Sequence, residues 1–107
     1  MVTETTPSFL GHDTARELAE AGISVTLISD ASIFALMSRV NKVIIGVHSV
    51  MANGGVIGYS GAAGICMAAH AHSVPVLVIS GIYKLSPLYP FDHGAFNETL
   101  SPNSILP

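Results

Sequence analysis

Three loops of the chain carry polar or glycine residues directly after an apolar run. Ser29-Asp30 follows the run VTLI, His48 follows VIIGV, and a third loop begins at Ser80 after VPVLVI. Ligands of open parallel sheets bind beyond the carboxyl ends of the strands, where such loops meet. The order of these segments therefore predicts a ligand site at this edge. Its candidate residues are Asp30, His48, Asn53, Gly54, Ser60 and Gly61.

The middle loop has the most informative spacing. Ala52-Asn53-Gly54-Gly55 supplies residues that adopt tight reversals, and Ser60 and Gly61 then precede a run of small residues with helical character. The free amides at the start of such a helix can hold an anion such as a phosphate. Glycines before a helix serve backbone geometry more often than phosphate binding, so this reading competes with a purely structural one.

Each titratable side chain of these loops has a catalytic and a structural interpretation. His48 has the imidazole of a general base, but a working site needs a positioned constellation, and a structural or interface histidine is favoured. Asp30 either orients a ligand or caps the helix that follows it, and capping is favoured because aspartate is preferred at that position.

The remaining candidates carry less chemistry. His70 and His72 do not have the i, i+4 spacing of metal-binding helices and are expected to cap helix carbonyls, so no metal site is predicted. Cys66 lies among small residues and is expected to be a buried apolar side chain. Lys84 lies in a proline-containing loop, where it is expected to be exposed and to serve either partner contact or a plain connection.

The elements that position these residues alternate between apolar runs and helical patterns. Continuous rather than alternating apolar runs are typical of parallel strands that helices cover on both faces. An α/β, doubly wound, Rossmann-like sheet follows, with right-handed crossovers. The segment VTET at the start reads as the end of a strand, so the sheet is expected to be truncated on its N-terminal side. Helices are expected at 13–21, 31–40 and 61–71.

Two of these helices have predicted ends or faces. Thr14 and Glu17 have the spacing of a capping box for the first helix, and Gly22 ends it. The second helix carries a broad apolar stripe, which is expected to pack on the sheet. The stripe consists of Ile33, Phe34, Met37 and Val40.

Composition limits the function classes. The 107 residues suit one domain, half of them are apolar, and only 10% are charged, so part of the apolar surface is expected to meet a partner. The net charge is −3 and the four basic residues are scattered, which argues against direct nucleic-acid binding. No apolar stretch approaches the roughly 18 residues of a membrane span. One cysteine without a cysteine partner fits a reducing, cytoplasmic setting, and no cofactor is predicted.

Several long strings resemble one known family across about Thr3 to Pro107. GVHSVMANGG, SRVNKVIIG, AHSVPVLV and YKLSPLYP resemble the C-terminal domain of the family that joins the initiation factor 2B regulatory subunits to sugar-phosphate isomerases. The isomerases act on ribose 1,5-bisphosphate and methylthioribose 1-phosphate. Within the family the strings most resemble the beta-type regulatory subunits. The resemblance implies that 1–107 is a C-terminal Rossmann-like domain without the family's N-terminal helical domain and first strands.

The resemblance also implies that the isomerase site is degenerate. Gly46 and the Asn53-Gly54 step match the isomerases, whereas His48 stands where they have a catalytic aspartate and Tyr59 where they have a lysine. The cysteine-bearing segment of the isomerases has no counterpart in the chain.

Three functions follow as expectations from the resemblance. The first is a non-catalytic regulatory and assembly domain of the guanine-nucleotide exchange factor for initiation factor 2, responsive to phosphorylated initiation factor 2 alpha. Its partners would be the delta, alpha, gamma and epsilon subunits and initiation factor 2, in a homo- or hetero-oligomer. The alternatives are an aldose-ketose isomerase of sugar phosphates, with His48 as the acid, and a sugar-phosphate or nucleotide sensor that binds between Asn53 and Gly61.

Overall fold

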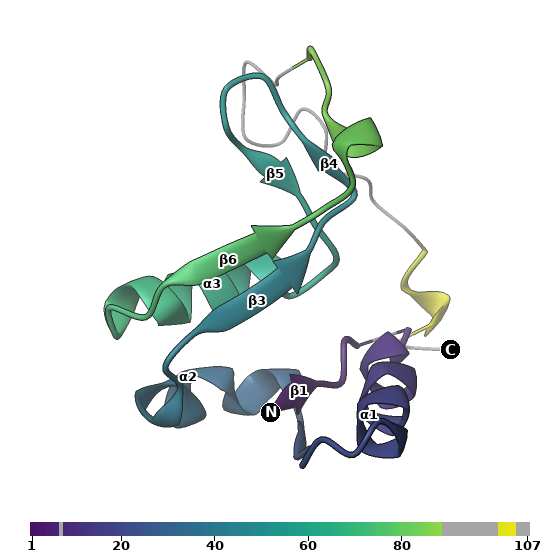
Figure 1. Ribbon diagram of the computed structural model, residues 1–107, viewed down its shortest axis with the longest axis vertical. Coiled ribbons are helices and arrows are strands. Elements are labelled where there is room, and N and C mark those ends of the chain that lie inside the picture. Colours follow the sequence, from purple (N-terminus) through teal and green to yellow (C-terminus); the bar gives the residue numbers. More distant parts are fainter. Residues whose placement is uncertain (7, 89–100, 105–107) are drawn as a thin grey trace.

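The computed structural model describes residues 1–6, 8–88 and 101–104. The end of the string YKLSPLYP, at 89–90, lies outside these residues. The α-helices are α1 (Leu10–Glu20), α2 (Ile33–Leu36) and α3 (Ala62–Ala71) (Figure 1). The strands are β1 (Val2–Thr3), β2 (Leu27–Ile28), β3 (Val43–Gly46), β4 (Ser49–Val50), β5 (Val56–Ile57) and β6 (Val76–Ile79). Short 3-10 turns are Asp30–Ser32, Met37–Arg39, Ile82–Lys84 and Pro102–Ser104.

The strands form three two-stranded sheets within the described part of the chain. β1 runs parallel to β2, with Val2 opposite Leu27, and β3 runs parallel to β6, with Val43 opposite Val76. The predicted parallel α/β architecture is confirmed at this level, whereas one continuous doubly wound sheet is not observed. β4 and β5 form an antiparallel hairpin that the sequence did not predict.

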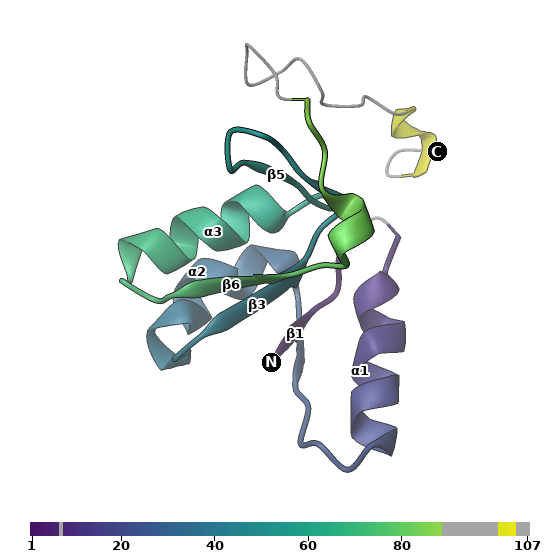
Figure 2. The same cartoon turned by 45° about the horizontal axis from the view of Figure 1, so that its top comes forward.

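The core lies on one face of the β3–β6 pair. Figure 2 shows α2 and α3 together on that face, while α1 lies apart from them beside β1. Alanines of α3 reach the centre of the core because their small side chains allow close approach of the helix. The buried cluster consists of Ile33, Met37, Val43, Ala68 and Ala69.

The other face of the β3–β6 pair is open. Ile44, Leu77 and Ile79 lie on it and remain 61%, 47% and 58% exposed. They alternate along the strands with core residues such as Val43, as the two-residue period of a strand requires. The prediction that helices cover these strands on both faces is therefore wrong for the described residues.

The first helix begins earlier than predicted. α1 starts at Leu10, not Asp13, after Phe9 in a left-handed conformation with φ of 56°. The Thr14 hydroxyl donates to the Leu10 carbonyl within the helix, so the predicted capping box is wrong. The end is as predicted: Gly22 has φ of 88°, and its amide donates to Ala19 O at 3.0 Å.

The second helical segment is broken rather than regular. α2 covers a single turn, and a 3-10 turn precedes and follows it between Asp30 and Arg39. The predicted stripe is confirmed for Ile33 and Met37, which are buried, and for Val40, which packs against the core. Phe34 is instead 61% exposed, with its ring against His72 of α3.

Membrane insertion of a helix finds no support in the described residues. None of their helices has both the length and the apolar character that crossing a bilayer requires.

Candidate functional site

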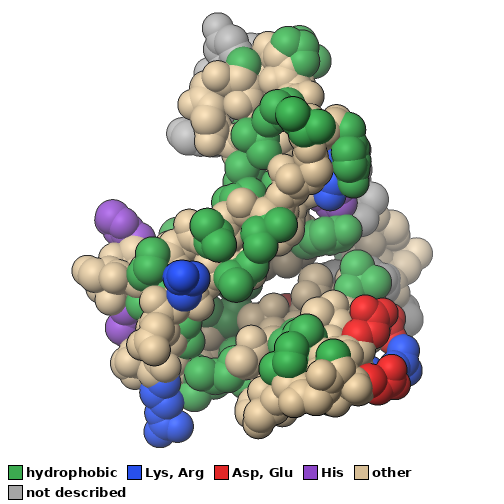
Figure 3. Space-filling model, viewed as in Figure 1, with side chains coloured by type: hydrophobic (Ala, Val, Ile, Leu, Met, Phe, Trp, Pro, Cys, Tyr) green, Lys and Arg blue, Asp and Glu red, His purple; other side chains and the backbone are tan. Residues whose placement is uncertain are grey.

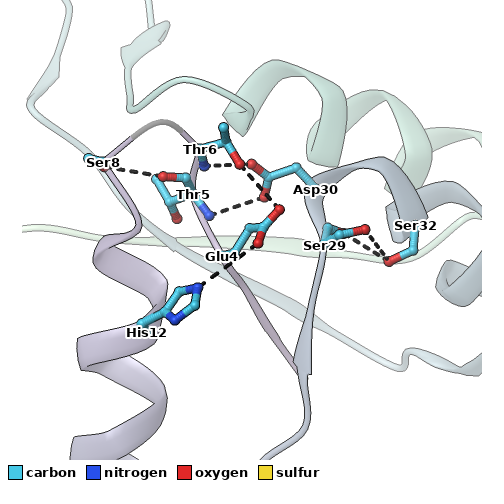
Figure 4. Close-up of polar contacts among 8 residues, drawn as sticks. All are labelled: Glu4, Thr5, Thr6, Ser8, His12, Ser29, Asp30 and Ser32. Atoms are coloured by element: carbon cyan, nitrogen blue, oxygen red, sulfur yellow. Dashed lines mark hydrogen bonds and ion pairs between the residues drawn. The ribbon is translucent and has the colours of Figure 1, made fainter. Parts of the chain in front are cut away.

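Asp30 connects the ends of β1 and β2. Its Oδ1 accepts a hydrogen bond from the Thr5 amide at 3.2 Å and its Oδ2 one from the Thr6 amide at 2.8 Å (Figure 4). The turn that Asp30 begins has Ser29 at its N-cap and no side-chain cap. Asp30 therefore does cap backbone amides, as its residue type favours, but those of a segment 24 residues away rather than of its own helix.

Asp30 and Gly61 lie at the same hollow between α2 and α3. The hollow has a volume of about 370 Å³ and is lined mainly by apolar atoms. The structure thus places one residue of the first loop and one at the start of α3 at the same hollow. Both carboxylate oxygens of Asp30 already accept hydrogen bonds from backbone amides. These bonds hold the carboxylate in place at the edge of the hollow. The lining is Asp30, Ala31, Ile33, Phe34, Gly61, Gly64, Met67 and Ala68.

His48 and Tyr59 contact each other across the base of the hairpin. Their ring centroids are 4.2 Å apart with an interplanar angle of 52°. The His48 amide donates to Ile57 O at 2.7 Å, two residues before Tyr59. Both side chains are exposed. They are the two positions where the isomerase resemblance implies an aspartate and a lysine, and here the two aromatic rings pack on each other.

Asn53 and Gly54 form the tip of the β4–β5 hairpin. The Asn53 side-chain oxygen accepts the Gly55 amide at 2.9 Å, and Gly54 has a left-handed φ of 84°. Figure 1 shows this tip pointing away from β3 and β6. The Asn53 carbonyl is thus used to close the turn, as short polar side chains do in such turns.

Ser60 and Gly61 precede α3 as predicted. Gly61 is the N-cap, with a left-handed φ of 94°, and no side chain caps the helix. Ser60 is exposed. The glycine is needed here for backbone geometry, because residues with a Cβ rarely adopt this conformation.

The six predicted residues thus occupy three places. Asp30 and Gly61 line the hollow, with Ser60 beside Gly61 in the chain, His48 lies at the hairpin base, and Asn53-Gly54 forms the hairpin tip. They do not converge on a single point.

Lys84 connects the loop after β6 to the end of β3, which the sequence did not predict. Its Nζ donates a hydrogen bond to the Val47 carbonyl at 2.9 Å, and the side chain is half-buried. The prediction of an exposed basic residue is therefore wrong. A second hydrogen bond joins the same two segments: the Ser86 amide donates to Val50 O at 2.8 Å. Lys84 and Ser86 together tie the loop after β6 to the chain around His48, 37 residues earlier at the Lys84 contact, and no local sequence pattern signals such a contact.

Replacing Lys84 with methionine is expected to lower the free energy of unfolding by about 1–2 kcal/mol, because the Val47 carbonyl loses a charged donor while the apolar stem is kept. Urea denaturation followed by circular dichroism measures the change. Lys42→Met is the control, because Lys42 is exposed. An equal loss in both variants would contradict the anchoring role of Lys84.

The histidines near the end of α3 differ from each other. His72 Nδ1 lies 3.0 Å from the Ala68 carbonyl, which confirms the capping prediction for this residue. Its ring also packs edge-on against Phe34, 4.8 Å between centroids, and so joins α3 to α2. His70 is exposed in the last turn. Cys66 is half-buried, less enclosed than predicted.

Comparison with known proteins places the chain in one family. Residues 1–107 match the Initiation factor 2 subunit family. The chain is similar to translation initiation factor eIF2B subunit beta of Dictyostelium discoideum, with 54% identity over 106 residues that cover 99% of the chain and 27% of the relative. It is also similar to the ribose 1,5-bisphosphate isomerase of Pyrococcus furiosus, with 36% identity, covering 100% of the chain and 33% of that protein.

Solved structures agree with these similarities. The translation initiation factor eIF-2B structure from Pyrococcus horikoshii superposes with a TM-score of 0.79 and 28% identity, covering 83% of the chain and 32% of that structure. The 5-methylthioribose 1-phosphate isomerase of the same organism shares the fold, with a TM-score of 0.90 at 24% identity, covering 99% of the chain and 31% of that structure. The chain thus spans about a third or less of the relatives it matches, and it belongs to the Initiation factor 2 subunit family.

Proposed function

We propose that the chain acts as a non-catalytic regulatory and assembly domain of the guanine-nucleotide exchange factor for translation initiation factor 2. The similarity to eIF2B subunit beta proteins supports the role in translation initiation, at 54% and 55% identity for Dictyostelium discoideum and Schizosaccharomyces pombe. Residues 1–107 form the C-terminal Rossmann-like part of such a subunit in this proposal. The protein works in the cytoplasm and contributes to the response to phosphorylated initiation factor 2 alpha.

The contact between His48 and Tyr59 is the observation that carries the non-catalytic part of the proposal. Proton transfer in an aldose-ketose isomerisation needs a carboxylate or similar group free to approach the substrate. The ring of His48 instead packs on Tyr59 at 4.2 Å, and neither residue lines the hollow beside Asp30. The carboxylate that does line the hollow is engaged by the Thr5 and Thr6 amides.

The partners follow from the same proposal. They are the delta, alpha, gamma and epsilon subunits of the exchange factor and initiation factor 2 itself. Exposed apolar side chains in the loop after β6, among them Ile82 at 84% and Tyr83 at 83%, supply contact surface next to the Lys84 anchor. Rigid aromatic and aliphatic groups of this kind are typical of interface centres.

Association is the direct test of the assembly role. Tagged full-length protein that contains this chain is expected to retain the delta and epsilon subunits in a pull-down from the cytoplasm. A double Ile82→Asp, Tyr83→Asp variant is expected to retain less. Ile23→Asp, at an exposed position (54%) away from this loop, is the control. A protein that retains neither subunit would contradict the proposal.

A sugar-phosphate isomerase or sensor is the second candidate function. The hollow between α2 and α3 favours it, because Gly61 places the start of α3 there and helix starts suit phosphate groups. Calorimetry with ribose 1,5-bisphosphate distinguishes the two: a sensor would give saturable heat, and the regulatory proposal expects none.

No turnover of ribose 1,5-bisphosphate or methylthioribose 1-phosphate is expected from the full-length protein, because His48 and Tyr59 replace the acid and the lysine. The measurement is product formation, with the Pyrococcus furiosus isomerase as the positive control. Turnover that disappears in His48→Ala would overturn the non-catalytic assignment.

A further inference from the structure

The tip of the β4–β5 hairpin carries a pair of residues that can react with each other. Asn53 has a side-chain amide, and Gly54 has no side chain to shield the backbone nitrogen that follows that amide in the chain. Both residues are exposed. A Cβ at Gly54 would meet nothing within 4 Å, so the surroundings of this nitrogen are open to water.

A hydrogen bond of the turn prepares the side-chain amide of Asn53 for attack. The Gly55 amide donates to Asn53 Oδ1 at 2.9 Å. A donor at this oxygen stabilises the negative charge that develops there when a nucleophile adds to Cγ. The same bond holds the side chain against the turn, which keeps Cγ close to the backbone nitrogen of Gly54.

One hydrogen bond has to open before the nitrogen can react. The Gly54 amide donates to Met51 O at 3.0 Å, and the nitrogen is a nucleophile only after it has lost this proton. The strands beside the tip are two residues long each, Ser49–Val50 and Val56–Ile57. Two short strands give a hairpin little stability of its own, so the tip is expected to open locally while the rest of the fold stays intact.

We propose that Asn53 is a site of spontaneous deamidation through a succinimide formed with the Gly54 nitrogen. This nitrogen gives its proton to a solvent base and bonds to Cγ, the Cγ–Nδ2 bond breaks, and the amide nitrogen leaves as ammonia with a proton from water. A water molecule then opens the ring. Opening at Cγ gives an aspartate, and opening at the backbone carbonyl gives an isoaspartate. Water is consumed and ammonia is released, and neither an oxidant nor a reductant is needed.

The product carries a negative charge in a part of the molecule that has none. Residues 31–88 contain neither aspartate nor glutamate. Figure 3 shows the acidic side chains of this face gathered around α1, at the opposite end of the molecule from the hairpin. An isoaspartate also lengthens the backbone of a turn that the Met51 amide closes by donating to Gly55 O at 2.8 Å. The Ala52 amide, which donates to Leu88 O at 3.1 Å, is expected to lose this contact.

The reaction is measured on full-length protein that contains this chain, incubated at neutral and at mildly alkaline pH. Cleavage after lysine then releases 43–84, in which Asn53 is the only asparagine. Deamidation of this peptide is expected to be at least about tenfold faster than deamidation at Asn41, which is also exposed but is followed by Lys42. The rate is expected to rise with pH, because the attacking nitrogen has to lose its proton.

Isoaspartate is detected with a protein-isoaspartate methyltransferase and labelled S-adenosylmethionine. Asn53→Gln is expected to abolish methylation of the peptide 43–84, because a longer side chain forms the six-membered ring much more slowly. Asn41→Gln is the matched control and is expected to leave this methylation unchanged. In the modified protein, hydrogen exchange at the Met51 and Ala52 amides is expected to be about tenfold or more faster.

Three results would overturn the proposal. They are the absence of deamidation in the peptide 43–84, equal rates at Asn53 and Asn41, and a rate at Asn53 that rises steeply with urea concentration below the unfolding midpoint. Local opening of the tip exposes little surface, so a steep dependence on urea would mean that only the unfolded chain reacts. The inference rests on the geometry of the hairpin and does not depend on the regulatory function.

Discussion

Gly11→Ala is expected to destabilise the fold by about 3 kcal/mol or more, a large part of the stability of a small domain. A Cβ at Gly11 would lie 1.8 Å from the Thr3 carbonyl oxygen and 2.9 Å from the Glu4 carbonyl carbon. Both are backbone atoms, so the start of α1 has to move away from β1. Urea denaturation measures the loss as a lower midpoint.

Gly64→Ala is the matched control for Gly11. It also lies within an α-helix, but a Cβ there meets nothing within 4 Å. The added methyl group is expected to stabilise α3 by about 0.5–1 kcal/mol through helix propensity. Stabilisation in both variants would contradict the close approach of α1 to β1.

Asp30→Ala is expected to lower the free energy of unfolding by about 2–3 kcal/mol, because the amides of Thr5 and Thr6 lose charged acceptors at 3.2 and 2.8 Å. The end of β1 is then no longer tied to the end of β2. Thermal unfolding measures the change. Asp30→Asn keeps one acceptor oxygen and is expected to fall between the wild type and Asp30→Ala.

Asp13→Ala provides the comparison for a carboxylate in an exposed ion pair. Asp13 and Arg16 are 2.7 Å apart but 59% and 68% exposed, so the loss is expected to be within about 0.5 kcal/mol. Equal losses for Asp13→Ala and Asp30→Ala would show that Asp30 does not connect the two strands.

The sequence predicted best where a local pattern decides the structure. The small-residue run of α3, predicted at 61–71, forms Ala62–Ala71, and Gly22 ends α1 as predicted because a left-handed residue is needed there. The apolar runs became β2, β3 and β6 in parallel pairs. Helix period, small-residue content and glycine all act within a few residues of the element they determine.

The features that the sequence did not predict depend on contacts between distant parts of the chain. α1 starts at Leu10 because the chain turns at Phe9 with φ of 56°, a conformation that phenylalanine does not signal. Asp30 caps the amides of Thr5 and Thr6 instead of its own turn, and Lys84 donates to Val47 O. Each of these partners is distant in sequence, so residue preferences alone could not identify it.

The candidate site also combines features that the sequence predicted with features that only tertiary packing determines. The resemblance singled out His48 and Tyr59 as the substituted positions, and the structure shows that their rings contact each other. The hollow at Asp30 and Gly61 required the packing of α2 against α3.

The most direct test of the assembly role is a chimera of the Schizosaccharomyces pombe relative, to which the chain is 55% identical over 95 residues. Residues of this chain replace the matched part of that protein, and the measurement is copurification of the other initiation factor 2B subunits with the tagged chimera. Copurification at the level of the unmodified protein is expected. A chimera that accumulates normally but copurifies with none of them would contradict it.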